Sequence, residues 1–283
     1  MNPSHVRHAA VAALLLLGSV SLNLSIVAPL YAQERPIVRV LAAGSLRNAF
    51  GDIGAAFLNS AKVAVETGFG PSGVLRQRIE VGETPDLFAS ADMDNPLALA
   101  KAGKAGPVVT FARNRLCAFV RPGLKVGSDT LLTALLDPKI RLGTSTPKAD
   151  PAGDYTWQVF AKADAIHPGD AAVLQAKALQ LVGGPNTVAP PAGMDAAAWN
   201  IREDRADIFI LYCSARVAFA NALPDGAVVE LPDRLATSAA YGLTLLPTKN
   251  PNAAELALFI LSQDGQSILA KNGFSAPLLD RAQ

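Results

Sequence analysis

Three short segments of the sequence combine small residues and a hydroxyl or carboxylate with the start of a helix. In the first, a β-forming run from Val38 reaches two alanines and a glycine, and Ser45 then opens a segment with apolar residues at helical spacing. Segments around Ser72 and around Asp150 repeat the device. A helix start has free backbone N–H groups and the positive end of the helix dipole, so it can hold an anion. The pattern predicts one small anion bound where three helix starts gather.

Each segment alone has a simpler interpretation. Serine is a common N-cap residue in any protein, so Ser45 by itself indicates capping and no ligand. The anion hypothesis rests on the three segments taken together.

The chemistry of these loops suits a tetrahedral dianion. The loops AAGSL, GFGPSGVL and DPAGDY contain no lysine or arginine. Hydroxyl and N–H groups bind such an anion without the desolvation of a cationic side chain. Tyr212, at the end of the apolar run DIFILY, adds a phenolic donor, or else it is an aromatic residue at the edge of the core.

Catalytic and metal-binding hypotheses find little in the sequence. There is no GxSxG motif, no P-loop and no GxGxxG after a strand. A hydrolase or transferase would depend on Asp150 or on His167, which precedes a Pro-Gly turn. Two cysteines and three histidines leave no plausible zinc set. We therefore predict no enzyme, no catalytic residue, no cofactor and no free metal cation.

Length and charge narrow the class of protein. With 283 residues, half of them apolar, the chain suits one large or two medium domains with a full core. The net charge of +1 gives no sign of a nucleic-acid groove or of binding to an acidic membrane surface.

The N-terminus predicts export. Arg7 and two histidines precede an apolar run from Ala9 to Val27, and Ala32 offers a small residue for cleavage. We expect residues 1–32 to be a cleaved signal peptide and the mature protein to be periplasmic. The alternative is an uncleaved membrane anchor, because the run approaches the ~20 residues of a membrane span.

Cys117 and Cys213 are the only cysteines. In an exported protein they form a disulfide or remain two buried thiols. Both alternatives stay open, because sequence does not give the Cα separation that a disulfide requires.

Strand and helix alternate three times in the 70 residues after the signal, which predicts a parallel sheet covered by helices. We expect two strands, 108–111 and 116–120, separated by Arg113–Arg115, and a helix over 171–181. The last helices, from Asn252, have no strands of their own to cover. The sequence thus predicts lobe I from 33–116 plus 247–283 and lobe II from 117–246, with hinge closure on a ligand.

Several motifs resemble one known family. They are LAAGSLRNAF, GFGPSGVLRQRIEVGETPDLFASAD, RNRLCAFV, the P-A-G tripeptide at 151–153, ADIFILYCSA and ALFILSQDGQSILAKNGF. They extend over nearly the whole chain after the signal. The chain resembles the periplasmic molybdate-binding proteins of ABC transporters, which have the type II periplasmic binding protein fold.

The resemblance implies an α/β fold of two lobes, each a mixed sheet flanked by helices, with the ligand cleft between them. It implies capture of molybdate, and usually tungstate, for an ABC permease in the inner membrane by a monomer. Carried over by motif, Ser45 and Ser72 supply hydroxyl ligands. Ala152 supplies a backbone N–H group, Tyr212 a phenol, and a position near Met194 a further N–H group.

The sequence also departs from that family. Asp150 stands directly before P-A-G, where the family usually lacks an acidic residue. A carboxylate repels a bound dianion unless it points away as a helix cap or binds the metal of the oxyanion directly. Sulfate, another small oxyanion or an organic acid therefore stays open as the ligand, as does a membrane-anchored sensor on the same fold. Ferric iron is disfavoured, because iron-binding relatives use paired tyrosines and Tyr212 has no neighbouring tyrosine in the sequence.

Overall fold

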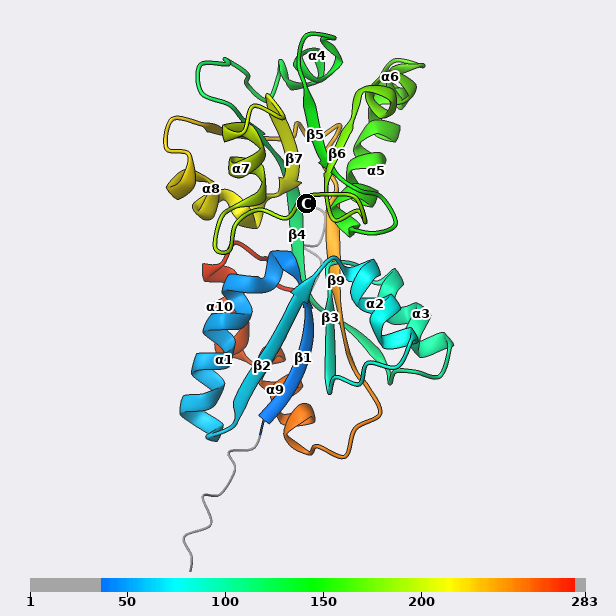
Figure 1. Ribbon diagram of the computed structural model, residues 1–283, viewed down its shortest axis with the longest axis vertical. Helices are drawn as coiled ribbons and strands as arrows, with labels where there is room; N and C mark the ends of the chain where they lie inside the picture. Colours follow the sequence, from blue (N-terminus) through cyan, green and yellow to red (C-terminus); the bar gives the residue numbers. More distant parts are fainter. Residues whose placement is uncertain (1–36, 278–283) are drawn as a thin grey trace, which may run out of the picture. The chain divides into compact units, whose positions relative to one another are not determined.

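The computed structural model describes residues 37–277, which belong to the compact unit Arg35–Gln283 (Figure 1). The predicted signal peptide, residues 1–32, lies outside the described residues. Across 37–277, no helix combines the length and the apolar character that crossing a membrane would require.

A mixed sheet runs through the described residues. Its strands are β1 (Ile37–Ala43), β2 (Ala64–Gly70), β3 (Leu87–Ser90), β4 (Val108–Val120), β5 (Leu142–Ser145), β6 (Leu179–Val182), β7 (Ile208–Tyr212), β8 (Ala227–Glu230) and β9 (Ser238–Leu245). Their order is β2-β1-β3-β9-β4-β7-β5-β6, and β8 pairs with β4. β1 is parallel to β2 and β3, whereas β9 is antiparallel to β3 and β4. The predicted mixed α/β class is confirmed.

Helices flank the sheet (Figure 1). They are α1 (Arg47–Ala61), α2 (Ser72–Glu80), α3 (Asp94–Lys101), α4 (Leu131–Leu136), α5 (Pro151–Ile166), α6 (Asp170–Lys177), α7 (Ala196–Arg202), α8 (Arg216–Ala222), α9 (Asn252–Leu261) and α10 (Gln263–Lys271). Short 3-10 turns η1 (Gly44–Leu46) and η2 (Cys213–Ala215) precede α1 and α8.

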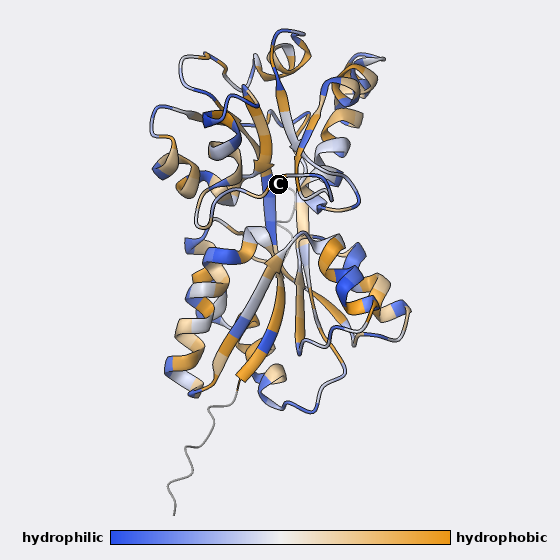
Figure 2. Cartoon of the chain, in the orientation of Figure 1, coloured by the Kyte–Doolittle hydropathy of each residue, from blue (hydrophilic) through white to orange (hydrophobic). Residues whose placement is uncertain are grey.

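Apolar periodicity explains why these segments form these elements. In α1, the buried residues Ala49, Phe50, Ile53 and Phe57 recur at helical spacing, so one stripe faces the core. Strands β3 and β5 are buried at every position, as strands covered on both faces are. Figure 2 shows apolar residues along the strands and on one side of many helices.

Strand β4 joins two groups of strands. Its residues 108–115 pair with β9, and its residues 116–120 pair with β7 and β8. We call β1, β2, β3 and β9, together with residues 108–115 of β4, the N-terminal half of the sheet. The other half consists of β5, β6, β7 and β8, together with residues 116–120 of β4. The prediction of two separate strands here was wrong. The chain keeps one strand of 13 residues because Arg113, Asn114 and Arg115 all find partners in β9, with a bulge between Thr110 and Ala112.

Residues 179–182 also differ from the prediction. They form β6, parallel to β5, and helix α6 ends at Lys177. The run ALQLV fits the end of a helix and a short strand equally well, so periodicity does not separate the two. Pairing with β5 decides in favour of the strand.

Candidate functional site

A pocket of about 320 Å³ lies where both halves of the sheet contribute loops. Five of the residues predicted to bind the ligand line it, namely Ser45, Ser72, Asp150, Met194 and Tyr212. Ala152, the sixth, is fully buried and is not among the lining residues. The pocket also has an apolar wall that includes Val182, Pro190, Leu211 and Ala218.

Ser72 and Tyr212 come from different halves of the sheet and meet at Ala91, just beyond the end of β3. The backbone N–H of Ala91 donates to Ser72 Oγ over 3.0 Å, and Tyr212 Oη donates to the carbonyl of Ala91 over 3.3 Å. Ser72 therefore accepts a hydrogen bond and keeps its own hydroxyl proton for a further acceptor. The two hydroxyl groups share one anchoring residue, which places both at the pocket wall.

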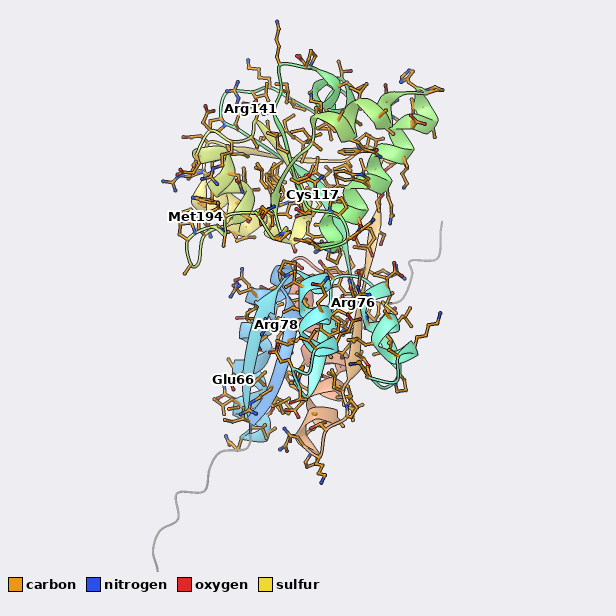
Figure 3. All side chains as sticks on the ribbon, turned by 45° about the vertical axis from the view of Figure 1, so that its right-hand side comes forward. Glu66, Arg76, Arg78, Cys117, Arg141 and Met194 are labelled. Carbon is orange, nitrogen blue, oxygen red and sulfur yellow. A yellow bond between two sulfur atoms is a disulfide. The ribbon has the colours of Figure 1, made fainter. Side chains whose placement is uncertain are left out.

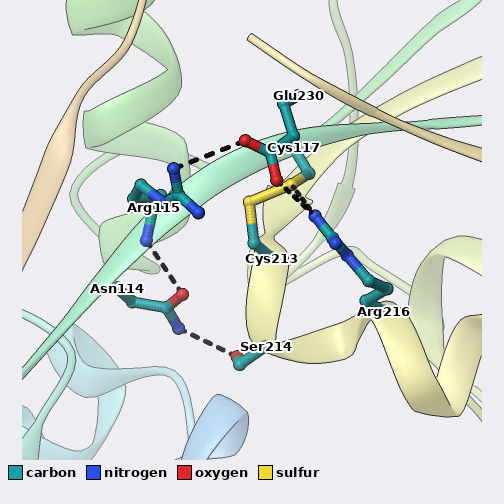
Figure 4. Close-up of a disulfide and its surroundings, with 7 residues drawn as sticks. All are labelled: Asn114, Arg115, Cys117, Cys213, Ser214, Arg216 and Glu230. Carbon is teal, nitrogen blue, oxygen red and sulfur yellow. Dashed lines mark hydrogen bonds and ion pairs between the residues drawn. A yellow bond between two sulfur atoms is a disulfide. The ribbon is translucent and has the colours of Figure 1, made fainter. Parts of the chain in front are cut away.

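Ser45 belongs to a second hydrogen-bonded group. Its Oγ lies 2.9 Å from Tyr241 Oη, and the Asn114 side-chain amide donates to the same Tyr241 oxygen over 3.3 Å. Asn114 also donates to Ser214 Oγ over 2.8 Å (Figure 4). β4 and β9 thus position Ser45 on one side of the pocket and Ser214 on the other through two buried side chains.

Tyr212 has tyrosine neighbours in space, although none is adjacent in sequence. The centroid of its ring lies 5.6 Å from that of Tyr241 and 6.4 Å from that of Tyr155. Burial raises the pKa of Tyr212 and of Tyr241, so both phenols stay protonated. A protonated phenol is a neutral donor suited to an anion, whereas a ferric ion would require phenolate.

Asp150 caps α5. Its Oδ1 accepts the backbone N–H of Ala152 over 3.0 Å. That N–H group, predicted to reach the ligand, is therefore already paired inside the protein. Burial raises the pKa of Asp150 to about 6, against the opposing effect of the Ala152 hydrogen bond.

Met194 lies in the loop before α7 (Figure 3). Its N–H group donates to the carbonyl of Pro191 over 3.0 Å, so it closes a turn and does not start the helix. The helix begins two residues later, at Ala196, and is capped by Asp195, whose carboxylate accepts the N–H of Ala198 over 2.8 Å.

Two glycines allow close packing around the loop that leads into α5, and one of them lies at the start of α2. The N–H of Gly73 donates to the carbonyl of Ala149 over 3.1 Å. A Cβ atom on Gly73 would lie 2.4 Å from the carbonyl oxygen of Lys148. A Cβ atom on Gly153 would lie 2.5 Å from the backbone nitrogen of Pro147. Glycine at position 73 therefore lets the start of α2 reach the loop before α5, and glycine at position 153 lets α5 pack against that same loop.

Replacing Gly73 by alanine tests this close approach. Alanine is the better helix former, by about 1 kcal/mol in a helix interior, yet we expect the variant to lose about 1 to 3 kcal/mol of stability through overpacking against backbone. Gly51→Ala is the matched control, because a Cβ atom at Gly51 in α1 meets nothing within 4 Å and should stabilise. Urea denaturation of both variants measures the difference. Equal stabilisation by both substitutions would contradict the close approach.

A disulfide joins Cys117 in β4 to Cys213, with Cα atoms 5.0 Å apart (Figure 4). Tyr212, the residue before Cys213, pairs with Leu116, the residue before Cys117, in the antiparallel pairing of β4 and β7. The disulfide therefore lies directly beside Tyr212. Arg115 and Arg216 both contact Glu230 beside it. Of the two alternatives left by the sequence, the structure has the bonded pair, which fixes η2 and the Ser214 side chain next to the pocket.

Several residues of this site escaped sequence reasoning. Arg47, Asn48 and Ser214 line the pocket, and Asn114 and Tyr241 support it. The Arg47 guanidinium lies over the ring of Phe69 at 4.5 Å, so a cation does stand at the pocket. Asn114 lies between two arginines in a strand, and only the register of β4 against β9 shows that it is buried. Among residues 37–277 no cluster of acidic, histidine or cysteine side chains is arranged to hold a metal ion.

Comparison with known proteins agrees with this fold and pocket. The chain belongs to the family of bacterial extracellular solute-binding proteins, whose sequence profile matches residues 38–275. It is 38% identical over 238 residues to an uncharacterized protein of Pasteurella multocida, covering 84% of this chain and 98% of that one. It is 28% identical over 244 residues to the molybdate-binding protein ModA of Mycobacterium tuberculosis, covering 84% of each chain.

Solved structures share the fold. The periplasmic molybdate-binding protein of Azotobacter vinelandii aligns with a TM-score of 0.69 and 20% identity, over 85% of this chain and 100% of that one. The sulfate-binding protein SubI of Mycobacterium tuberculosis aligns with a TM-score of 0.70 and 19% identity, over 87% and 88%. These similarities establish the fold. The ligand has to be argued from the residues of the pocket.

Proposed function

We propose that this protein captures a small oxyanion in the periplasm, molybdate first among the candidates and tungstate with it, and delivers it to an ABC permease. The convergence of the Ser72 and Tyr212 hydroxyl groups on Ala91 carries the proposal. Ser72 keeps a hydroxyl proton for the ligand, and Tyr212 becomes a second neutral donor if its proton turns from the Ala91 carbonyl to the ligand. Donors of this kind, from different halves of the sheet, suit a dianion that needs several hydrogen bonds. The similarity to proteins named for molybdate binding supports the choice of ligand.

The remaining parts of the proposal follow from the family. We expect a monomer that uses no cofactor and catalyses no reaction. The sequence assigns residues 117–246 to lobe II, and β9 (Ser238–Leu245) within that range pairs with β3 and with residues 108–115 of β4. We expect residues 1–32 to be removed on export, so N-terminal sequencing should give a start near Gln33, and an intact N-terminus would favour the membrane anchor.

The size of the pocket favours a second candidate, an organic acid. Pockets that enclose small organic ligands have volumes of about 300 to 1,000 Å³ and mostly apolar linings. The pocket holds about 320 Å³ and has an apolar wall. Either the loops close further on a small oxyanion or the ligand carries an apolar part that contacts Val182 and Leu211.

Calorimetric titration of the mature protein with molybdate, tungstate, sulfate and a set of small organic acids tests these candidates. We expect one-to-one binding of molybdate and tungstate. Ser72→Ala should weaken that binding 5- to 150-fold, because an unmet oxyanion hydrogen bond costs about 1 to 3 kcal/mol. Ser60→Ala is the matched control, since the Ser60 hydroxyl bonds only the α1 backbone in the described structure. Binding heat from an organic acid, with none from molybdate or tungstate, would identify the organic acid as the ligand. Unchanged affinity for molybdate in Ser72→Ala would refute the proposed site.

A further inference from the structure

Asp150 occupies the position at the pocket where the start of α5 would otherwise meet a ligand. It lines the pocket, and its Oδ1 accepts the Ala152 N–H group. Gly183 packs against its other face, where a Cβ atom would lie 2.9 Å from Oδ2. The side chain is therefore held between α5 and the loop after β6. The Asp150 carboxylate therefore already interacts with the positive, N-terminal end of the α5 dipole.

The charges around Asp150 are mostly of its own sign. Asp154 on α5 and Asp92 after β3 both raise its pKa, in addition to the larger effect of burial. Tyr212 faces it from β7 as a neutral phenol, and the carboxylate raises the pKa of that phenol. The cation lining the same pocket is Arg47, which lies over Phe69. A dianion entering this pocket thus meets an ionised carboxylate, and the guanidinium in the pocket lining already contacts an aromatic ring.

We propose that Asp150 takes up one proton when an oxyanion dianion binds in the pocket, so that its carboxyl group donates to a ligand oxygen. The inference rests on the proposed function of the same pocket. One carboxyl oxygen keeps the hydrogen bond from Ala152, and the other carries the new proton toward the ligand. The proton comes from solvent, so the bound pair of Asp150 and dianion carries two negative charges in place of three.

The linkage has a definite sign. Because the pKa of Asp150 in the free protein is about 6, the side chain is mostly ionised above pH 6. Two adjacent negative charges raise this pKa further in the complex. Between pH 6 and the pKa in the complex, each dianion therefore binds with about one proton, and affinity falls about tenfold for each rise of one pH unit.

Calorimetry with molybdate at pH 6, 7 and 8, in buffers of different ionisation enthalpy, measures both quantities. We expect uptake of about one proton at pH 7 to 8 and a loss of affinity of up to 100-fold from pH 6 to pH 8. Asp150→Asn should take up no proton and keep its affinity within about twofold over this range, because an amide caps the helix and donates without titrating. Asp225→Asn, an exposed position outside the pocket lining, should keep the wild-type slope.

The outcomes separate this inference from the proposed function. If the wild type binds molybdate without proton uptake and with the same affinity from pH 6 to pH 8, the role of Asp150 is overturned. The proposed function of the pocket as an oxyanion site is then unaffected. Binding of molybdate by Asp150→Asn alone would overturn the inference, because the wild-type carboxylate would then exclude the dianion instead of taking up a proton. Absence of heat from molybdate, tungstate and sulfate in both proteins would overturn both proposals.

Discussion

Replacing Cys117 and Cys213 by alanine is expected to lower the free energy of unfolding by about 4 to 5 kcal/mol. The disulfide closes a loop with a sequence separation of 96 residues. In the chain-entropy account, a cross-link of this span restricts the unfolded chain by about 4.7 kcal/mol. Since domains are commonly stable by only about 5 to 15 kcal/mol, the loss would be a large share of the total.

Denaturation of the oxidised protein, the reduced protein and the double variant measures this effect. The reduced wild type should resemble the variant, and dithiothreitol should leave the variant unchanged. A difference of less than 1 kcal/mol between oxidised wild type and variant would mean that the disulfide contributes little. We also expect the slope of the unfolding transition to rise in the variant, because an unfolded chain without the cross-link exposes more surface.

Asp150→Asn is expected to stabilise the ligand-free protein by about 2 kcal/mol at pH 8. Burial raises the pKa of Asp150 from the ordinary 3.8 to about 6 in the folded state. The folded state thus binds the proton more tightly than the unfolded state, so stability falls as pH rises from about 4 to 6 and stays lower above that. Each pKa unit is worth about 1.4 kcal/mol, and the contact of the carboxylate with pocket water reduces the total.

The pH dependence distinguishes this effect from a general improvement. Asparagine is an equally good N-cap residue, so the variant should match the wild type near pH 4 and exceed it progressively up to pH 6 and beyond. Urea denaturation at pH 4, 6 and 8 gives the three differences. A stability difference of constant size at all three pH values would show that Asp150 does not titrate as its surroundings indicate.

Local patterns predicted much of the fold because they depend on neighbouring residues. The alternation of β1, α1, β2, α2 and β3 follows from periodicity and helix-start residues, and it is confirmed. Ser45, Ser72 and Tyr212 were found because each stands where a strand ends or a helix begins, and all three line one pocket. Their role as ligands stays a prediction.

The features that sequence missed depend on partners far along the chain. β4 is one strand because β9, more than 100 residues later, pairs with the segment predicted to be a break. Asn114 and Tyr241 reach the pocket through that same pairing. The Ala152 N–H group donates to the Asp150 carboxylate two residues away. Only the position of that carboxylate in the structure shows that Asp150 caps the helix.

The pairing of β9 also constrains when the protein can fold. The N-terminal half of the sheet includes β9, between β3 and β4, and that strand ends at Leu245. Until the ribosome has released nearly the whole chain, β3 and the first part of β4 have no partner between them. Contacts of such long sequence separation form slowly, since loop closure must precede them. The late pairing of β9 therefore leaves the N-terminal half of the sheet incomplete until synthesis has passed Leu245.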